Sequence, residues 1–209
     1  MRRVSIVARL VEEYSPPIPE PMPMLEQYTT PGDIAARLAS NMSLREDLEE
    51  ASILDLGAGT CRLSLALALY GATRIVAVDV DYRLPPLCIG AFRNAGLPVL
   101  DAYIVGRIRP GTRLLVEASF DIIVMNPPFG VQRKGADTEF LVYAMSLRPR
   151  RIYAILKTGN EQYHTGLAEK YGYRHRVLYR ERFPIPATMR HHKSRIRRVD
   201  VNVSVFERV

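Results

Sequence analysis

The segment from Ser52 to Tyr70 constrains the fold of this chain more than any other part of the sequence. A short apolar run from Ser52 to Leu56 ends in two glycines, Gly57 and Gly59, and helical periodicity follows from Cys61 to Tyr70. Glycines at such a point permit a tight backbone turn and the close approach of a ligand. The N-terminus of the following helix offers unpaired N–H groups to that ligand. The pattern therefore predicts a strand, a ligand-binding turn and a helix in succession.

Segments of strand and helix character alternate along the rest of the chain. The further strands that we expect are Arg74–Val80, Val99–Val105, Phe120–Met125, Arg151–Leu156, Arg174–Arg182 and Val199–Phe206. The further helices that we expect are Leu84–Ala95, Thr138–Leu147 and Glu161–Tyr171, with one more starting at Thr29-Thr30-Pro31. Strands separated by helices predict an α/β fold with a mostly parallel sheet and helices on both faces. The last two strands alternate like an antiparallel pair.

Size and composition limit the class of protein. A chain of 209 residues, 47% of them hydrophobic, can form one sizeable core but not two ordinary domains. No apolar run approaches the ~20 residues that cross a bilayer, and no signal-like segment stands out, so we expect a soluble, cytoplasmic protein without a membrane partner. The only cysteines, Cys61 and Cys88, form no C-x-x-C pair, which argues against a disulfide scaffold and against a zinc site.

The first 24 residues are expected to lie outside the core. Val4 to Glu13 has the character of a short helix, and five prolines follow between Ser15 and Pro23. Prolines fix φ and remove backbone donors, so an extended tether is expected there. We therefore divide the chain into a Pro-rich arm, residues 1–24, and a single domain, residues 25–209, with a basic loop at residues 190–198.

The glycine turn has acidic residues placed to hold a nucleoside-containing cofactor. Asp79 lies at the end of the second strand, where an acid can accept hydrogen bonds from ribose hydroxyls. Asp81 is the better candidate for a helix N-cap or a solvated strand end, and its role stays open. Arg62 replaces the third glycine of the dinucleotide fingerprint, so the turn fits either a phosphate or an amino-acid carboxylate. Asp55 can anchor the turn or meet a cationic group of the cofactor.

Asn126-Pro127-Pro128-Phe129 is the most informative stretch for chemistry. It follows the apolar strand directly, and its two prolines stiffen the backbone and remove two donors. The side-chain oxygen of Asn126 and the carbonyl of Pro127 can both accept from one planar –NH2 group, while Phe129 offers a face for base stacking. A plain proline turn after a buried strand is the alternative without a function.

An exocyclic amine is a weak nucleophile because its lone pair is delocalised into the ring. Two acceptors on its hydrogens would favour a pyramidal nitrogen and aim the lone pair at a methyl donor. The proton can leave after attack, so no strong base is required, and catalysis rests on positioning and electrostatics. The motif therefore predicts an amino-methylating enzyme more firmly than it predicts a nucleic-acid substrate.

Basic residues are concentrated in the C-terminal third. Residues 145–209 contain fifteen Lys and Arg against five Asp and Glu, while the whole chain carries a net charge of +7. Such a distribution suggests a surface that faces a polyanion, and a solvated basic face is the equal alternative on charge alone. The residues that we predict to contact RNA are His191, His192, Lys193, Arg195, Arg197 and Arg198. The two adjacent histidines have no third ligand nearby, so no metal is predicted.

Taken together, the motifs resemble one family, the small-subunit ribosomal RNA adenine-N6 methyltransferases of eukaryotes and archaea. The resemblance covers residues 25–206 and is carried by Leu25-Glu26-Gln27-Tyr28-Thr29-Thr30-Pro31, Asp55–Gly59, Asn126–Gly130 and the basic segment before Val199. It implies a Rossmann-like class I methyltransferase fold with a seven-stranded sheet and S-adenosylmethionine bound across the strand ends. The acceptor would be an unpaired or flipped adenine.

The resemblance also assigns residues. It implies a cofactor pocket lined by Gln27, Thr30, Gly57, Thr60, Asp79 and Asn126, to which we add Asp55 and Gly59. It implies that Asn126, Pro127 and Phe129 hold the adenine, and Pro128 completes that turn. Family members usually place an acid after the third strand, whereas Ile104–Arg107 contains none. Eukaryotic relatives bind a small zinc-ribbon activator at a strand edge, for which Ala102–Val105 is the candidate.

Two other functions remain open. A protein glutamine methyltransferase acting on release factors would grip a side-chain amide with the same turn, although Phe129 in place of tyrosine and the basic C-terminal third favour RNA. A non-catalytic RNA-binding module would keep the fold without turnover, and the intact Asn126–Phe129 motif argues against it.

Overall fold

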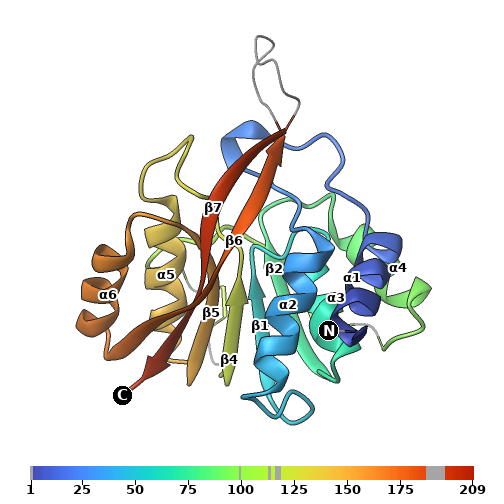
Figure 1. Cartoon of the computed structure of the whole chain (residues 1–209), viewed down its shortest axis with the longest axis horizontal. Helices are drawn as coiled ribbons and strands as arrows, with labels where there is room; N and C mark the ends of the chain where they lie inside the picture. Colours follow the sequence, from blue (N-terminus) through green and yellow to red (C-terminus); the bar gives the residue numbers. More distant parts are fainter. Residues whose placement is uncertain (1, 99, 113, 116–118, 187–195) are drawn as a thin grey trace.

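One seven-stranded sheet organises the molecule in the computed structural model, which describes residues 2–98, 100–112, 114–115, 119–186 and 196–209. The strand order is β3-β2-β1-β4-β5-β7-β6 (Figure 1). The strands are β1 (Ser52–Leu56), β2 (Arg74–Asp79), β3 (Ala102–Val105), β4 (Ile122–Met125), β5 (Arg151–Lys157), β6 (Tyr173–Pro186) and β7 (Ile196–Arg208). The first five strands pair in parallel, and β7 runs antiparallel to both β5 and β6. The predicted fold class is confirmed.

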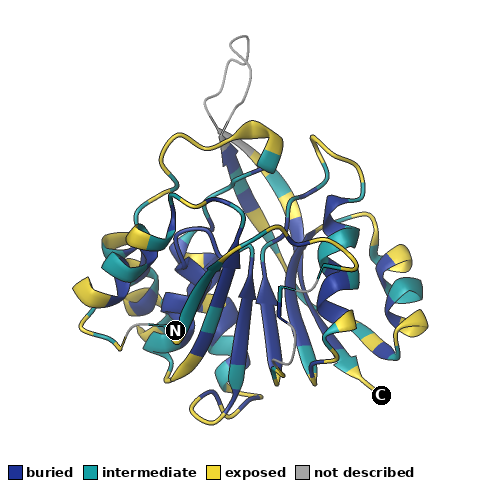
Figure 2. Ribbon diagram, turned by 180° about the vertical axis from the view of Figure 1, so that it is seen from behind, coloured by how far each residue is buried: buried dark blue, intermediate teal, exposed yellow. Residues whose placement is uncertain are grey.

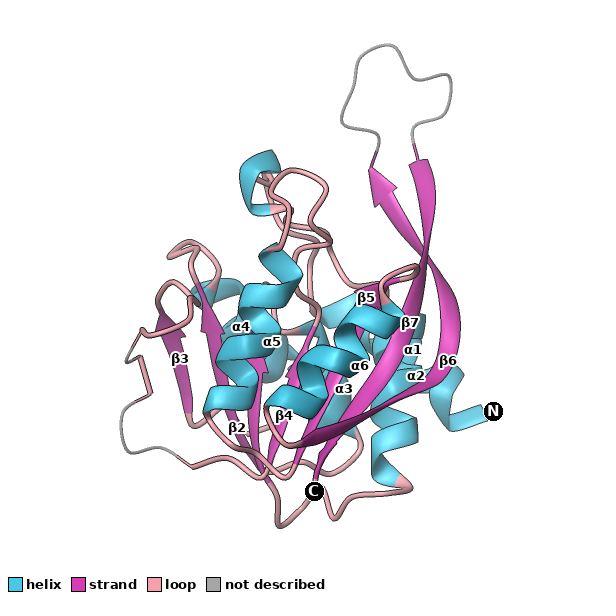
Figure 3. Ribbon diagram, turned by 90° about the vertical axis from the view of Figure 1, so that its left-hand side faces the viewer, coloured by secondary structure: helices cyan, strands magenta, loops and turns pink. Residues whose placement is uncertain are grey.

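Helices cover both faces of this sheet (Figure 3). They are α1 (Arg2–Tyr14), α2 (Gly32–Ser43), α3 (Arg62–Leu69), α4 (Pro85–Asn94), α5 (Ala136–Ser146) and α6 (Glu161–Lys170), with a short 3₁₀ turn, η1 (Pro23–Leu25). Successive residues of a strand face opposite sides, so Ile53 joins the core under α1–α4, while Leu54 joins the core under α5 and α6. The strands in the middle of the sheet are buried on both faces (Figure 2), which accounts for their continuous apolar runs.

The C-terminal hairpin is longer than predicted. Pairing between β6 and β7 continues to Pro186 opposite Ile196, so the hairpin projects beyond the carboxyl ends of the parallel strands (Figure 1). The expected strands ended earlier because prolines interrupt the alternation near the tip, yet an edge strand such as β6 tolerates proline. Most of the predicted basic loop, residues 190–195, lies outside the described residues.

The structure corrects the prediction that residues 1–24 lie outside the core. Val7 and Val11 of α1 are buried at 3% and 0% exposure and belong to the core cluster beneath α1–α4. Val4, Val7 and Val11 recur at helical spacing, so they form a narrow apolar stripe that needs a packing surface. The prolines that follow this helix indicated an extended tether, so the packing of the stripe against the core was not predicted.

The two cysteines are joined by a disulfide, although the sequence argued against a disulfide scaffold. Cys61 and Cys88 form a disulfide between the start of α3 and the middle of α4, and both side chains are fully buried. The helices pack on the same face of the sheet, so the Cα atoms approach to 5.2 Å although 27 positions separate them. In the described part of the chain, no helix has the length and apolar character needed to span a membrane.

Candidate functional site

Three neighbouring strands of the sheet end side by side, at the edge formed by the carboxyl ends of the parallel strands. Leu56 of β1 lies opposite both Val78 of β2 and Met125 of β4, so the residues that follow them emerge side by side. Those residues are Gly57, Asp79 and Asn126, which belong to the three separate motifs. Ligands of open α/β sheets bind outside the carboxyl ends of the strands, where this edge lies.

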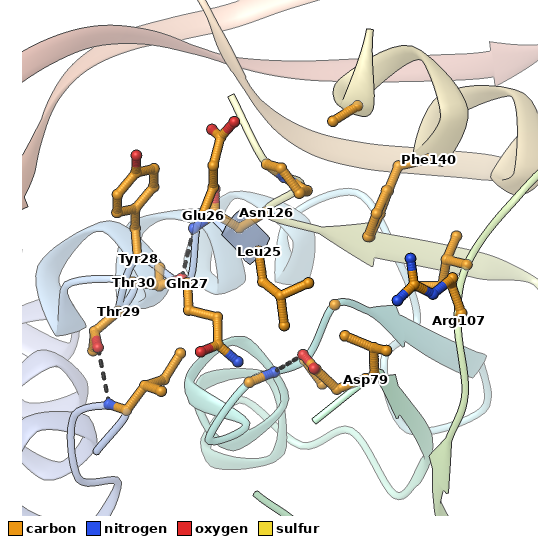
Figure 4. Close-up of a pocket in the computed structure, with 18 of the residues that line it drawn as sticks. Leu25, Glu26, Gln27, Tyr28, Thr29, Thr30, Asp79, Arg107, Asn126 and Phe140 are labelled. Atoms are coloured by element: carbon orange, nitrogen blue, oxygen red, sulfur yellow. Dashed lines mark hydrogen bonds between the residues drawn. The ribbon is translucent and has the colours of Figure 1, made fainter. Parts of the chain in front are cut away.

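A cavity of about 320 Å³ lies at this edge (Figure 4). Most of the residues assigned from the sequence line it, namely Gln27, Thr30, Gly57, Gly59, Thr60, Asp79, Asn126 and Pro128. Asp55, Pro127 and Phe129 are not among its lining residues. The volume is in the range of small-molecule and cofactor sites.

The glycine turn after β1 is held in a conformation that favours glycine. Gly57 and Gly59 have φ values of +75° and +57°. The amides of Gly57 and Ala58 both donate to the Val78 carbonyl, at 2.8 and 3.0 Å. A Cβ atom on Gly57 would lie only 3.0 Å from the ring of Phe140. Substitution there would therefore strain the backbone and fill the cavity.

Asp79 is the acid that faces the cavity. Its Oδ2 accepts from the Gly59 amide at 2.9 Å and its Oδ1 from the Asp81 amide at 3.0 Å. Each oxygen keeps a lone pair for a ligand hydroxyl, as the ribose role requires. Burial raises the pKa of Asp79. Asp81 is engaged elsewhere, since Arg83 and Gln27 donate to it and lower its pKa.

The proline-rich segment forms one wall of the cavity. Ile18 lines the cavity, and the Ile18 amide donates to Thr29 Oγ1 at 3.1 Å. Thr60 Oγ1 donates to the Pro16 carbonyl at 2.8 Å. Gln27 fixes the C-terminal end of this segment, because its Oε1 accepts from the Met22 amide at 2.8 Å. The segment expected to be a tether therefore shapes the cofactor side of the site.

Asp55 supports the glycine turn from behind. Its Oδ2 accepts from the amide and the hydroxyl of Ser64, at 3.2 and 2.6 Å, near the start of α3. Its Oδ1 is buried and has no partner within the described residues. Of the two roles predicted for Asp55, this geometry fits the anchoring of the turn. Burial raises the pKa of Asp55 to about 7.

Asp55→Asn is expected to become more stable relative to the parent as the pH rises from 4 to 8. The folded pKa of Asp55 lies above its unfolded value, so the stability associated with the protonated acid is present at low pH and lost as the pH rises towards 7. The asparagine variant lacks this loss, and the difference should reach on the order of 3 kcal/mol. Urea unfolding at each pH measures it.

The matched control is Asp121→Asn. Ser52 donates to Asp121 through its amide and hydroxyl, which lowers the pKa of Asp121. Here the sign is opposite, so the variant should lose stability relative to the parent as the pH rises towards 4, and the two stability curves should run nearly parallel from pH 4 to 8. Parallel stability curves for the parent and Asp55→Asn would contradict the assignment.

Asn126 presents an unused acceptor. Its Nδ2 donates to Thr30 Oγ1 at 2.9 Å, while its Oδ1 is buried and has no partner within the described residues. The bond to Thr30 fixes the orientation of the amide, so the oxygen remains available to a ligand donor. A buried polar atom left without a partner is costly, and a bound amine would remove that cost.

The aromatic platform differs from the prediction. Phe129 is only 6% exposed and packs edge-on against Phe183, with ring centroids 5.2 Å apart. Tyr28 stacks on Phe129 at 5.7 Å with an interplanar angle of 22°. Tyr28 and Phe140 line the cavity and Phe129 does not, so these two rings provide its aromatic surface.

Sequence reasoning left several lining residues without a role. They are Glu26, Tyr28, Phe140, Ile108, Arg107, Arg109 and Arg133. Glu26 and Tyr28 belong to the Leu25–Pro31 motif, so the sequence contained a pattern from which their place in the site could have been predicted. Arg107 stands on the loop after β3, where the resemblance implied an acid, and Figure 4 shows it beside Phe140.

The predicted RNA-contacting residues are only partly described. His191, His192, Lys193 and Arg195 lie outside the described residues. Arg197 and Arg198 lie on β7 opposite Ile185 and Pro184, and Arg198 is exposed. Their role in RNA binding stays a prediction.

Comparisons with known proteins identify the family of the chain. The model of the family "Methyltransferase small domain" matches residues 32–186. The rRNA N(6)-adenosine-methyltransferase Mettl5 of Drosophila melanogaster is 34% identical over 208 residues, and the match covers 95% of each chain. The enzyme of the same name from Danio rerio is 28% identical over 186 residues, covering 88% of each chain.

Solved structures share the fold. The crystal structure of PH1948 from Pyrococcus horikoshii matches with a TM-score of 0.83 and 28% identity, and covers all of both chains. Protein 1320 of Thermoplasma acidophilum matches with a TM-score of 0.68 at 18% identity, covering 100% of this chain and 98% of the other. At that lower identity the likeness concerns the fold alone.

Proposed function

This chain belongs to the methyltransferase small domain family, together with the rRNA N(6)-adenosine-methyltransferases that it matches, and we propose that it methylates the exocyclic N6 of an adenine in small-subunit ribosomal RNA. The observation that carries the proposal is the Oδ1 of Asn126, which has no partner among the described residues. Asn126 lines the same cavity as Asp79 and the glycine turn. That the protein is located in the cytoplasm stays a prediction from the sequence.

The residues present fit S-adenosylmethionine, the cofactor of this family, which supplies a methyl group activated on a sulfonium. Asp79 offers its carboxylate to ribose hydroxyls. The turn at Gly57 and Gly59 leaves room for close approach, and the N-terminus of α3 behind it suits a carboxylate. Thr30 and Gln27 close the side formed by the N-terminal segment.

On the acceptor side, the chain positions an amine. Asn126 Oδ1 would accept one N6 hydrogen and the Pro127 carbonyl the other, which localises the lone pair on the nitrogen. Thr30 Oγ1 accepts from Asn126 Nδ2, which leaves Asn126 Oδ1 free for the amine. These contacts supply orientation and electrostatic stabilisation rather than a strong base. The proton leaves after the new N–C bond has formed.

The proposed partner, a small zinc-ribbon activator, fits the edge of the sheet. β3 is an end strand of the sheet, as predicted for residues 102–105, and Val105 is 47% exposed. An exposed apolar edge can accept a strand from another chain.

The test is transfer of labelled methyl to RNA by the purified protein. We expect N6-methyladenosine in unmodified small-subunit RNA and no label in release factor. The assay is repeated with a zinc-ribbon protein, whose strand addition should raise the rate or solubility. Label in a glutamine of release factor, or in no acceptor, would contradict the proposal. Full activity and solubility of the isolated chain would remove the support for an activator.

A further inference from the structure

Glu26 has a backbone conformation that a non-glycine residue rarely adopts. Its φ and ψ are +49° and +44°, in the left-handed region. The Glu26 amide donates to the Pro23 carbonyl, and the Tyr28 amide donates to the Glu26 carbonyl at 2.8 Å. A strained conformation of this kind costs roughly 1 kcal/mol and persists where the surrounding contacts require it.

The side chain of Glu26 is buried and only half satisfied. It is 5% exposed, and its Oε1 accepts from the amides of Gln132 and Arg133, at 2.7 and 3.4 Å. Its Oε2 is enclosed and has no partner within the described residues. The guanidinium of Arg133, whose amide donates to Glu26, is paired with Glu139 instead. One carboxylate oxygen is therefore held in place while the other is left for a donor from outside the chain.

Glu26 lies on the side of the cavity where the proposed function places the target adenine. It lines the cavity together with Tyr28 and Asn126, and Figure 4 shows Glu26 and Tyr28 on the opposite side from Asp79. Its two amide partners directly follow the Asn126–Gly130 turn, which the proposed function assigns to the target base. The charge of Glu26 also contributes, after burial, to the raised pKa of Tyr28.

The donors of the target nucleotide limit what Oε2 can contact. An ionised carboxylate only accepts hydrogen bonds. In the proposed function, both N6 hydrogens go to Asn126 and Pro127, and the adenine ring has no other donor. The remaining donor in an RNA nucleotide is the 2′-hydroxyl, which is also the group that distinguishes RNA from DNA.

We propose that Glu26 Oε2 accepts a hydrogen bond from the 2′-hydroxyl of the target nucleotide and so makes the site selective for RNA. This inference rests on the proposed function. Glu26 acts as a specificity-determining residue, and its Oε1 bonds to Gln132 and Arg133 set the direction of the free oxygen in advance.

A single-atom change in the substrate tests this. The substrates are a short unmodified RNA containing the target adenosine and the same RNA with 2′-deoxyadenosine at that one position. For the parent protein, kcat/KM should fall about tenfold to hundredfold with the deoxy substrate, as for loss of a hydrogen bond to a charged group. In Glu26→Gln the same change should cost no more than about threefold, since a hydrogen bond between a neutral amide and the hydroxyl is weaker than one to a carboxylate.

Glu26→Gln keeps one oxygen for the Gln132 amide, so the loop can stay in place. The control is Glu139→Gln, whose carboxylate pairs with Arg133, and which should retain the parent's preference for RNA. Equal discrimination by the parent and Glu26→Gln would overturn the proposal, and so would a parent that methylates both substrates equally. Failure of the proposed function gives a different result, because then the parent methylates neither substrate.

Discussion

Asn126→Ala is expected to slow methyl transfer by about 10²- to 10³-fold, the usual effect of removing one preorganised polar contact to a reacting group. The variant loses the donor to Thr30 Oγ1 and the buried Oδ1, which has no partner in the part of the chain that the structure describes. Affinity for S-adenosylmethionine should change by less than about tenfold, because Asp79 and the glycine turn remain. Single-turnover rates with saturating RNA measure the chemical step, and calorimetry measures cofactor affinity.

Asn202→Ala is the matched control for this variant. Asn202 also has a buried Oδ1 without a partner in the described chain, and its Nδ2 donates to Glu161 at 2.7 Å. It lies on β7 and is not among the residues that line the cavity. Loss of this side chain should lower stability without slowing the chemical step. An undiminished rate in Asn126→Ala would leave the acceptor assignment without support.

Arg62→Met is expected to destabilise the fold by about 3–5 kcal/mol. The Arg62 side chain is 6% exposed and donates to the Ser15 carbonyl through Nε and Nη2, at 3.1 and 2.8 Å. Its Nη1 donates to the Thr30 carbonyl at 3.1 Å and pairs with Glu12 at 2.8 Å. Methionine fills a similar volume but leaves these carbonyls without donors, so urea unfolding should show a lower midpoint.

Arg37→Met separates this effect from the general loss of an arginine. Arg37 pairs with two carboxylates, those of Asp33 and Glu181, but its side chain is 45% exposed. Exposed ion pairs contribute little, so the cost should stay below about 1 kcal/mol. If the two variants lost similar free energies of unfolding, the buried hydrogen bonds of Arg62 to the Ser15 and Thr30 carbonyls would not account for its effect.

The fold could be predicted from the sequence because its elements are locally encoded. The glycines after β1 and the apolar runs of β2 and β4 gave the parallel core and the edge where ligands bind. Asp79 and Asn126 followed from their places at strand ends. The alternation of residues in the last two strands predicted the antiparallel pair.

Contacts between distant segments could not be predicted in this way. The bond between Glu26 and the Gln132 amide joins residues 106 positions apart, and neither residue type signals the other. Phe129 was expected to be the stacking surface, but it packs on Phe183, which lies on the far hairpin. The bridge between Cys61 and Cys88 likewise depends on how two helices pack. Tertiary packing decides all three.

Proline-rich ends are often trimmed when proteins are prepared for study, and here such trimming would be harmful. A shortened polypeptide starting at residue 25 would lack Ser15, whose hydroxyl donates to the Thr60 carbonyl at 2.8 Å, and Ile18 against Gly59. It would also uncover the surface now occupied by Val7 and Val11. Inactivity of a trimmed preparation would therefore reflect a damaged cofactor wall rather than the lack of an activating partner, and affinity tags are better attached at the other terminus.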